Sequence, residues 1–262
     1  MRNLKLVLAY DGTGYHGFQI QKGTGLPTIQ GTLEQALSIL TQEEVSVIGA
    51  GRTDAGVHAQ GQVVNFQSKT TVPIERFPFA INSLLPDDIV VLKAEEVDAD
   101  FHACFSAQSK TYCYTFYQAK FRDPFWRYYS YHVPVTLNIA EMQQACQIFI
   151  GEHDFSAFCA SGSSVKDFTR IIYSCSIEKE EKIVRFTVSG KGFLYNMVRI
   201  MAGTLLEVGQ GKRKAGDVVG LLQSGERKLA GMTLPPQGLS LLLVGYEENP
   251  LTQPATCIKI NQ

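Results

Sequence analysis

The sequence predicts an α+β protein of two similar half-domains, because strand-like and helix-like patterns alternate twice along its 262 residues. Residues 1–106 show the order strand, helix, strand, strand, helix, strand. The same order recurs loosely in residues 107–249. We expect mixed, mainly antiparallel sheets that meet at a central active-site cleft, with helices on the outer face. Residues 250–262 are polar and are expected to form a tail.

The first half opens with a strand at residues 4–10, where leucines alternate with other residues before a glycine-rich turn. A helix is predicted over 29–40, because apolar residues recur there at helical spacing after Thr28, a candidate N-cap. The other expected elements of this half are strands at 45–50, 62–67 and 89–97 and a helix at 74–85. The segment GRTDAGVHAQG therefore lies in a loop between two strands.

The second half begins with KTYCYTFYQ at 110–118, whose alternating aromatic and smaller residues predict a strand. The elements expected after it are an amphipathic helix at about 138–150, a hairpin at 171–189 that turns at EKEEK, helices at about 193–208 and 215–223, and a last strand at 239–246.

Charge and composition argue against several classes of protein. The 24 basic and 25 acidic residues leave a formal charge of −1, unlike a chain that coats nucleic acid through bulk charge. The six cysteines form no C-x-x-C pair and show no zinc-like spacing with the five histidines, so no metal site is expected. The N-terminal segment lacks the apolar stretch of a signal peptide, and no run approaches a membrane span. We expect a cytoplasmic protein without membrane contact.

The glycine pattern GTGYHG at 12–17 follows a predicted strand and so resembles the fingerprint of a dinucleotide site. That fingerprint requires a helix to begin at the glycines, whereas GTGLP at 23–27 predicts a continuing loop. We interpret the glycines as loop positions that permit positive φ, and we expect no nucleotide cofactor. A nucleotide-dependent oxidoreductase is an alternative that rests on this pattern alone.

The loop GRTDAGVHA at 51–59 places a base, a hydroxyl, an acid and a histidine around two glycines. Dense polar loops of this kind often carry function. The alternative is a tight turn in which Asp54 only caps backbone amides. His58 lies between the apolar Val57 and Ala59 and is expected to be structural.

Two residues of the second half are further candidates for function. Tyr112 is either a half-buried strand aromatic or, beside Lys and Arg, a ring on which an RNA base stacks. Arg199 lies among apolar residues, where a guanidinium requires a partner and a carboxylate is its natural bidentate mate. Candidates for contacts with RNA phosphates are the basic residues Lys110, Lys120, Arg122, Arg127, Lys166, Arg170 and Lys212 to Lys214.

Five separated segments occur in the order YDGTGYHGFQ, GRTDAGVHA, FHACFSAQSKTYCY, GEHDFSAF and FLYNMVRIMAGTLLEVG. Together they resemble the bacterial tRNA pseudouridine synthase A family over residues 4 to about 247. The resemblance implies an isomerase that uses no cofactor and no metal. It also implies a tRNA substrate, modified at positions 38, 39 and 40 of the anticodon stem-loop, and a homodimer in which both subunits grip each tRNA.

The same resemblance implies roles for four residues. Asp54 is taken as the catalytic nucleophile, Arg199 as the ion-pair partner that keeps it charged, Tyr112 as the ring packed on the target base, and Arg52 as a residue that holds the RNA. The carboxylate could attack ribose C1′, attack uracil C6 or remove a ribose proton, and the sequence leaves these routes open. A non-catalytic RNA-binding module is the main alternative from another class.

Overall fold

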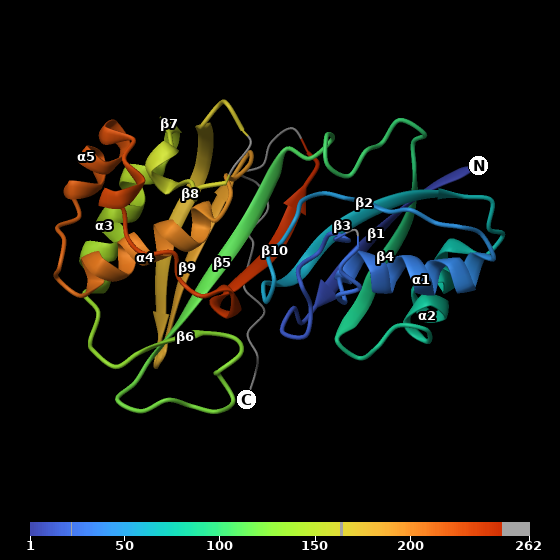
Figure 1. Cartoon of the computed structure of the whole chain (residues 1–262), viewed down its shortest axis with the longest axis horizontal. Coiled ribbons are helices and arrows are strands. Elements are labelled where there is room, and N and C mark those ends of the chain that lie inside the picture. The colour runs from blue at the N-terminus through green and yellow to red at the C-terminus, as the bar shows by residue number, and fades with distance from the viewer. Residues whose placement is uncertain (22, 163–164, 248–262) are drawn as a thin grey trace. The chain divides into compact units, whose positions relative to one another are not determined.

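A computed structural model of the chain describes residues 1–21, 23–162 and 165–247. It divides into two compact units (Figure 1), of which the first comprises Met1–Gln108 and Ser240–Tyr246. Ser109–Leu239 form the second unit. Each unit combines a sheet with helices, so the α+β class is confirmed. The tail expected at 250–262 lies outside the described residues.

The sheet of the first unit has the strand order β4-β1-β3-β10, and β2 also pairs with β3. Its strands are β1 (Arg2–Tyr10), β2 (Ile48–Gly49), β3 (His58–Ser68), β4 (Ile89–Val97) and β10 (Leu239–Gly245). All of these pairs are antiparallel except β3 with β10. The chain thus returns to its first unit through β10, although the sequence division grouped that segment with residues 107–249.

The helices of the first unit are α1 (Ile29–Thr41), the short 3-10 helix η1 (Ile74–Arg76) and α2 (Phe77–Asn82). The Thr28 hydroxyl accepts a hydrogen bond from the Gly31 N–H at 3.2 Å, which confirms Thr28 as the N-cap of α1. The single helix expected at 74–85 is instead split in two. Pro78 explains the break, because proline lacks an N–H and is tolerated only in the first turn of an α-helix. Figure 1 shows α1 across the sheet with α2 beside it.

The sheet of the second unit has the strand order β5-β9-β8-β7, with β6 paired to β5. Its strands are β5 (Ser109–Gln118), β6 (Tyr131–Val133), β7 (Gly151–Asp154), β8 (Thr169–Glu180) and β9 (Ile183–Gly190). The expected hairpin is confirmed as β8 and β9, and it turns at Glu181, which adopts a positive φ of 51°. Strands β6 and β7 were not expected from the sequence.

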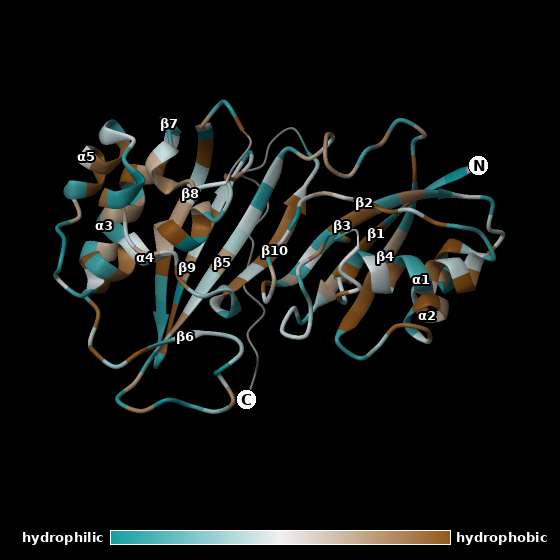
Figure 2. Cartoon of the chain, in the orientation of Figure 1, coloured by the Kyte–Doolittle hydropathy of each residue, from teal (hydrophilic) through white to brown (hydrophobic). Residues whose placement is uncertain are grey.

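The helices of the second unit are α3 (Ile139–Phe149), α4 (Met197–Gly209) and α5 (Asp217–Ser224), with short 3-10 turns η2 (Ser156–Phe158), η3 (Arg227–Leu229) and η4 (Pro236–Gly238). Helices α3 and α4 contact each other, α3 packs on β8 and α4 on β5. Almost all of α4 is apolar and buried (Figure 2).

The start of α4 corrects the expected helix at about 193–208. Asn196 has a left-handed backbone with φ 60°, which a right-handed helix cannot include, so α4 begins only at Met197. Phe193 therefore lies in the segment before the helix and not on its apolar face. Within the described ranges, no helix is both long enough and apolar enough to cross a membrane.

Candidate active site

Asp54 lies in the first unit on the loop of residues 50–57 that connects β2 with β3, as the sequence predicts. Its side chain is partly buried, whereas Arg52 is exposed. The main-chain carbonyl of Asp54 accepts a hydrogen bond from the Val57 N–H at 3.1 Å. This bond between residues i and i+3 closes a tight turn, so the main chain fixes the direction in which the loop presents Asp54.

The glycine-rich segment after β1 holds this loop from one side. The Phe18 N–H donates to the Thr53 carbonyl at 3.0 Å, and the Gly56 N–H donates to the Tyr15 carbonyl at 3.3 Å. Gly17 adopts a φ of +89°, and a Cβ there would approach the Thr53 carbonyl oxygen to 2.7 Å. The glycines therefore permit a close approach of two backbones. No helix begins at them, since the next helix starts at Ile29, which agrees with the interpretation of these glycines as loop positions.

A hydrogen bond between two buried hydroxyl groups also restrains the Asp54 loop. The Tyr10 hydroxyl, at the end of β1, lies 2.8 Å from the Thr53 hydroxyl, and the two residues are 4% and 7% exposed. Burial raises the pKa of Tyr10 from 10.0 to about 12, so the phenol is neutral at physiological pH. A buried hydroxyl without a partner is costly, so this bond restrains the residue next to Asp54.

The imidazole of His58 supports the other end of the loop. His58 is buried at the start of β3, and its Nδ1 accepts a hydrogen bond from the Gly12 N–H at 3.1 Å. The same nitrogen lies 3.1 Å from the Asp11 carboxylate. A Cβ at Gly12 would overlap the carbonyl oxygen of Val57, so only glycine permits this packing. These contacts agree with the structural role expected for His58.

Tyr112 lies on β5 in the second unit, opposite Val188 of β9. It is buried, and the Phe193 ring packs against it edge to face, with centroids 5.1 Å apart and an interplanar angle of 84°. Edge-to-face packing is a favoured geometry for aromatic pairs. The segment before α4 therefore fixes the orientation of the Tyr112 ring.

Arg199 lies in the first turn of α4 and is held by two hydrogen bonds. Its Nε donates to the Leu234 carbonyl at 2.7 Å, and its Nη1 donates to the Asn196 side-chain oxygen at 2.7 Å. A cation near a helix N-terminus is unfavourable by about 0.3–1 kcal/mol, because the helix dipole is positive there. The dipole of α4 therefore does not favour the cation, and the two hydrogen bonds fix the position of its guanidinium.

Two glycines allow the segment around Leu234 to pack closely against α4. A Cβ at Gly203 would overlap the Met232 carbonyl, and the Gly231 N–H donates to the Thr204 hydroxyl at 3.0 Å. One residue further on, the Pro235 carbonyl accepts a hydrogen bond from the Tyr114 hydroxyl at 2.8 Å. Helix α4 and strand β5 are therefore both anchored to this segment, which sets the position of the Arg199 guanidinium.

The structure thus places the four predicted site residues in two pairs. Arg52 and Asp54 share one loop of the first unit, and Tyr112 and Arg199 lie in the second unit on β5 and α4. The ion pair between Asp54 and Arg199, and the stacking of a base on Tyr112, stay predictions.

Sequence analysis missed the residues that support these four. The contacts of Tyr10 with Thr53, of Asn196 with Arg199 and of Phe193 with Tyr112 were not foreseen. One signal was available, because the short polar segment that follows Tyr10 already stood out by its glycines. Nothing local in the sequence marks Asn196 as the residue that bonds a guanidinium.

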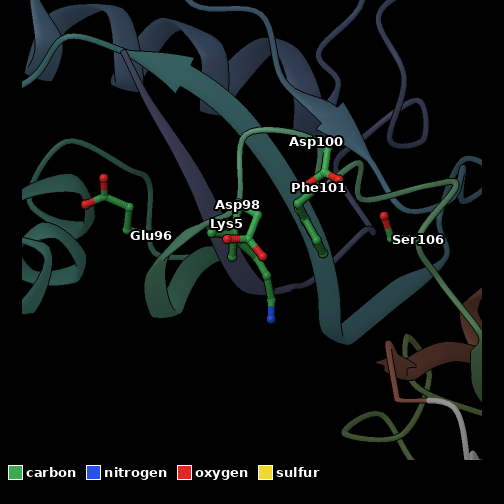
Figure 3. Close-up of a pocket in the computed structure, with 7 residues that line it drawn as sticks. Lys5, Glu96, Asp98, Asp100, Phe101 and Ser106 are labelled. Carbon is green, nitrogen blue, oxygen red and sulfur yellow. The ribbon is translucent and has the colours of Figure 1, made fainter.

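A separate hollow of about 470 Å³ lies in the first unit (Figure 3). The residues that line it are Lys5, Glu96, Val97, Asp98, Asp100, Phe101 and Ser106. None of them belongs to the Asp54 loop, and three are carboxylates. The Lys5 ammonium is paired with Glu95 at 2.9 Å. The acidic lining is unsuited to an RNA backbone, so we assign it no part in the site.

Over residues 1–21, 23–162 and 165–247, no group of three or more His, Cys, Asp and Glu side chains is arranged to hold a metal ion. The five cysteines in those ranges form no disulfide.

An aspartate in a short, tightly held loop is a group that can act as a nucleophile or as a general base. The family model described as tRNA pseudouridine synthase matches residues 6–106 and 145–247. The chain belongs to the tRNA pseudouridine synthase family. The resemblance seen in five separated segments is therefore confirmed.

Its relatives match along nearly the whole chain. The tRNA pseudouridine synthase A of Acetivibrio thermocellus is 50% identical over 246 residues, which cover 94% of this chain and 100% of the relative. The protein of the same name from Thermoanaerobacter sp. shows the same identity and coverage. The Brevibacillus brevis protein of that name is 46% identical, again over 94% of this chain and all of the relative.

Proposed function

We propose that the chain isomerises uridine to pseudouridine at positions 38, 39 and 40 in the anticodon stem-loop of tRNA. The observation that carries this proposal is the Asp54 loop, which the end of β1 and the segment after it hold through backbone bonds, close glycine contacts and a buried hydroxyl pair. Rigid placement of a reacting group supplies much of an enzyme's rate enhancement. Membership of the tRNA pseudouridine synthase family supplies the reaction type.

The reaction breaks the bond between uracil N1 and ribose C1′ and forms a bond between uracil C5 and the same carbon. The proton on C5 is lost and N1 gains one, so substrate and product are isomers. Asp54 acts in its ionised form, by attack on C1′, by attack on C6 or by removal of a ribose proton. Each route ends in the loss of the C5 proton, which makes that proton a direct reporter of turnover.

The other three site residues have complementary roles in the proposal. Arg199 provides the positive charge that pairs with the carboxylate of Asp54. Tyr112 packs on the uracil after it leaves the helical stack, which offsets part of the few kcal/mol that extrusion costs. Arg52, exposed beside Asp54, binds the RNA backbone near the extruded nucleotide.

We also infer that the protein acts in the cytoplasm as a homodimer whose subunits grip each tRNA together. The support for both inferences is the resemblance to the tRNA pseudouridine synthase A family.

The test is an assay of tritium release. Unmodified tRNA labelled with tritium at uracil C5 is incubated with the purified protein, and tritium in the water is measured. The proposal predicts release, with pseudouridine then mapped to positions 38, 39 or 40. Tight binding without release would show a non-catalytic RNA-binding module, and release with pseudouridine mapped elsewhere would contradict the assignment to the anticodon stem-loop.

A further inference from the structure

The loop of residues 119–130 between β5 and β6 (Figure 1), which we term the aromatic loop, carries large aromatic rings that are exposed to solvent. Phe125 is 86% exposed and Phe121 is 73% exposed. Tyr128 and Tyr129 are also exposed. Single exposed apolar residues are common, but four exposed rings within nine residues form a patch of the kind that marks a binding surface.

Cations alternate with these rings along the loop. The loop contains three basic residues, Lys120, Arg122 and Arg127, and one acidic residue, Asp123, so its net charge is positive. Lys120 Nζ lies 5.3 Å from the ring centroid of the neighbouring phenylalanine, and Arg127 Cζ lies 4.2 Å from that of the neighbouring tyrosine. Cations beside exposed aromatic rings suit a ligand that has both flat bases and negative charge.

Internal bonds hold the aromatic loop in one conformation. Asp123 accepts hydrogen bonds from the Phe125 N–H at 2.9 Å and, through its carbonyl, from the Trp126 N–H at 3.2 Å. The Trp126 ring stacks on Tyr117 of β5, with an interplanar angle of 15°, and the Trp126 carbonyl accepts from the Ser130 hydroxyl. The rings are thus displayed by a preorganised loop, which lowers the entropy cost of binding.

We propose that the aromatic loop is a second RNA contact, on which unpaired bases of the tRNA stack while the cations meet the adjoining phosphates. The choice of tRNA rests on the proposed function. Tyr112 and Gln118 are six residues apart on β5, which at a rise of about 3.3 Å per residue separates the aromatic loop from Tyr112 by roughly 20 Å. The loop therefore binds nucleotides other than the one that reacts.

A second copy of the chain is the competing occupant. A two-fold interface centred on this loop would bring the cations of one copy toward those of the other. Like charges at an interface are costly, whereas a polyanion neutralises them. The charge of the loop therefore favours RNA.

The first experiment uses the fluorescence of Trp126, which is the only tryptophan in the chain and lies in this loop. The full chain is titrated with an unmodified tRNA transcript, and binding is followed in parallel by tRNA anisotropy. The proposal predicts that Trp126 emission changes and saturates together with binding. Polyphosphate, which has the charge but no bases, is expected to compete without changing the emission.

Three results would overturn the proposal. They are an unchanged Trp126 emission while tRNA binding saturates, an equal change with polyphosphate, and an emission that depends on protein concentration without RNA, which would identify a second copy as the occupant. The tritium assay on the same samples separates this proposal from the proposed function. Release without an emission change refutes the aromatic loop alone, and an emission change without release refutes the catalysis alone.

The second experiment removes the rings. In the double variant with Phe121→Ala and Phe125→Ala, we expect tRNA binding to weaken by at least about fivefold, since one base stacked on an aromatic ring contributes about 5- to 150-fold. The matched control is Phe79→Ala on α2, which removes a phenylalanine that is 80% exposed and lies outside the aromatic loop. The control is expected to bind and turn over tRNA as the unaltered chain does. Equal binding by the double variant and the control would contradict the proposal.

Discussion

Gly17 offers the sharpest test of how the Asp54 loop is held. A Cβ at this position would lie 2.7 Å from the Thr53 carbonyl oxygen and 3.3 Å from both Ala55 N and Asp54 C. Ordinary van der Waals contact begins at 3.4 Å, so in Gly17→Ala the loop must move by about 0.7 Å. Misplacement of a reacting group by about 1 Å can cost about 100-fold in rate, and we therefore expect kcat to fall roughly 10- to 100-fold. The φ of +89° adds a loss of folding stability of about 1–2 kcal/mol.

Two other glycines separate these effects. Gly25→Ala introduces a side chain at a φ of +65° with no atom within 4 Å, so it should cost stability without affecting turnover. Gly14→Ala meets no atom within 4 Å and should change neither property. The measurements are kcat from tritium release and the free energy of unfolding in urea. If Gly17→Ala had the kcat of the unaltered chain, the idea that this contact positions Asp54 would be wrong.

Three further predictions concern Tyr10, which supports the loop, and the site residues Arg199 and Tyr112. Tyr10→Phe removes a phenol whose pKa burial raises from 10.0 to about 12, and the raised pKa lowers the stability of the folded state as the pH increases from about 10 to about 12. Between urea titrations at pH 9 and pH 11 the variant should therefore lose less stability than the unaltered chain, by about 1 kcal/mol. Arg199→Lys keeps the positive charge, but an ammonium group cannot hydrogen-bond both the Leu234 carbonyl and the Asn196 side chain as the planar guanidinium does. The value of kcat should therefore fall at least about tenfold in the tritium assay, and an unchanged kcat would contradict a role for the positioned guanidinium in turnover. Tyr112→Phe preserves the ring and should bind tRNA as well as the unaltered chain, whereas Tyr112→Ala should bind at least about fivefold more weakly by anisotropy; equal binding by both variants would remove the stacking role.

Elements with a strong local pattern were predictable from the sequence. Strand β4 has the predicted bounds, and α1 begins after its predicted N-cap Thr28, because alternation and capping are properties of a few neighbouring residues. Strand β7 was missed, since its residues, GEHD, show no apolar alternation and become a strand only by pairing with β8. Its formation depends on a partner that is distant in the sequence.

The residues of the candidate site were predictable from the sequence, but the contacts that hold them in place were not. The Asp54 loop was recognisable because it concentrates polar residues between two predicted strands. Its clamp joins residues near Tyr10 with residues near Thr53, which are 43 positions apart. Such long-range bonds leave no periodic signal, and the glycines of the clamp even resembled a different motif. Arg199 was a candidate because a charged residue among apolar neighbours requires a partner. Its partner, the Leu234 carbonyl, is set by the packing of the segment around Leu234 against α4 and has no local signal in the sequence.

The central claim is that the carboxylate of Asp54 carries out the isomerisation, and Asp54→Asn tests it most directly. The substitution preserves the size of the side chain and removes its charge, so the fold and the affinity for tRNA should be retained. In a single-turnover assay with tRNA labelled at uracil C5, tritium release is expected from the unaltered chain and none from Asp54→Asn. Release by Asp54→Asn at a rate close to that of the unaltered chain would contradict the central claim.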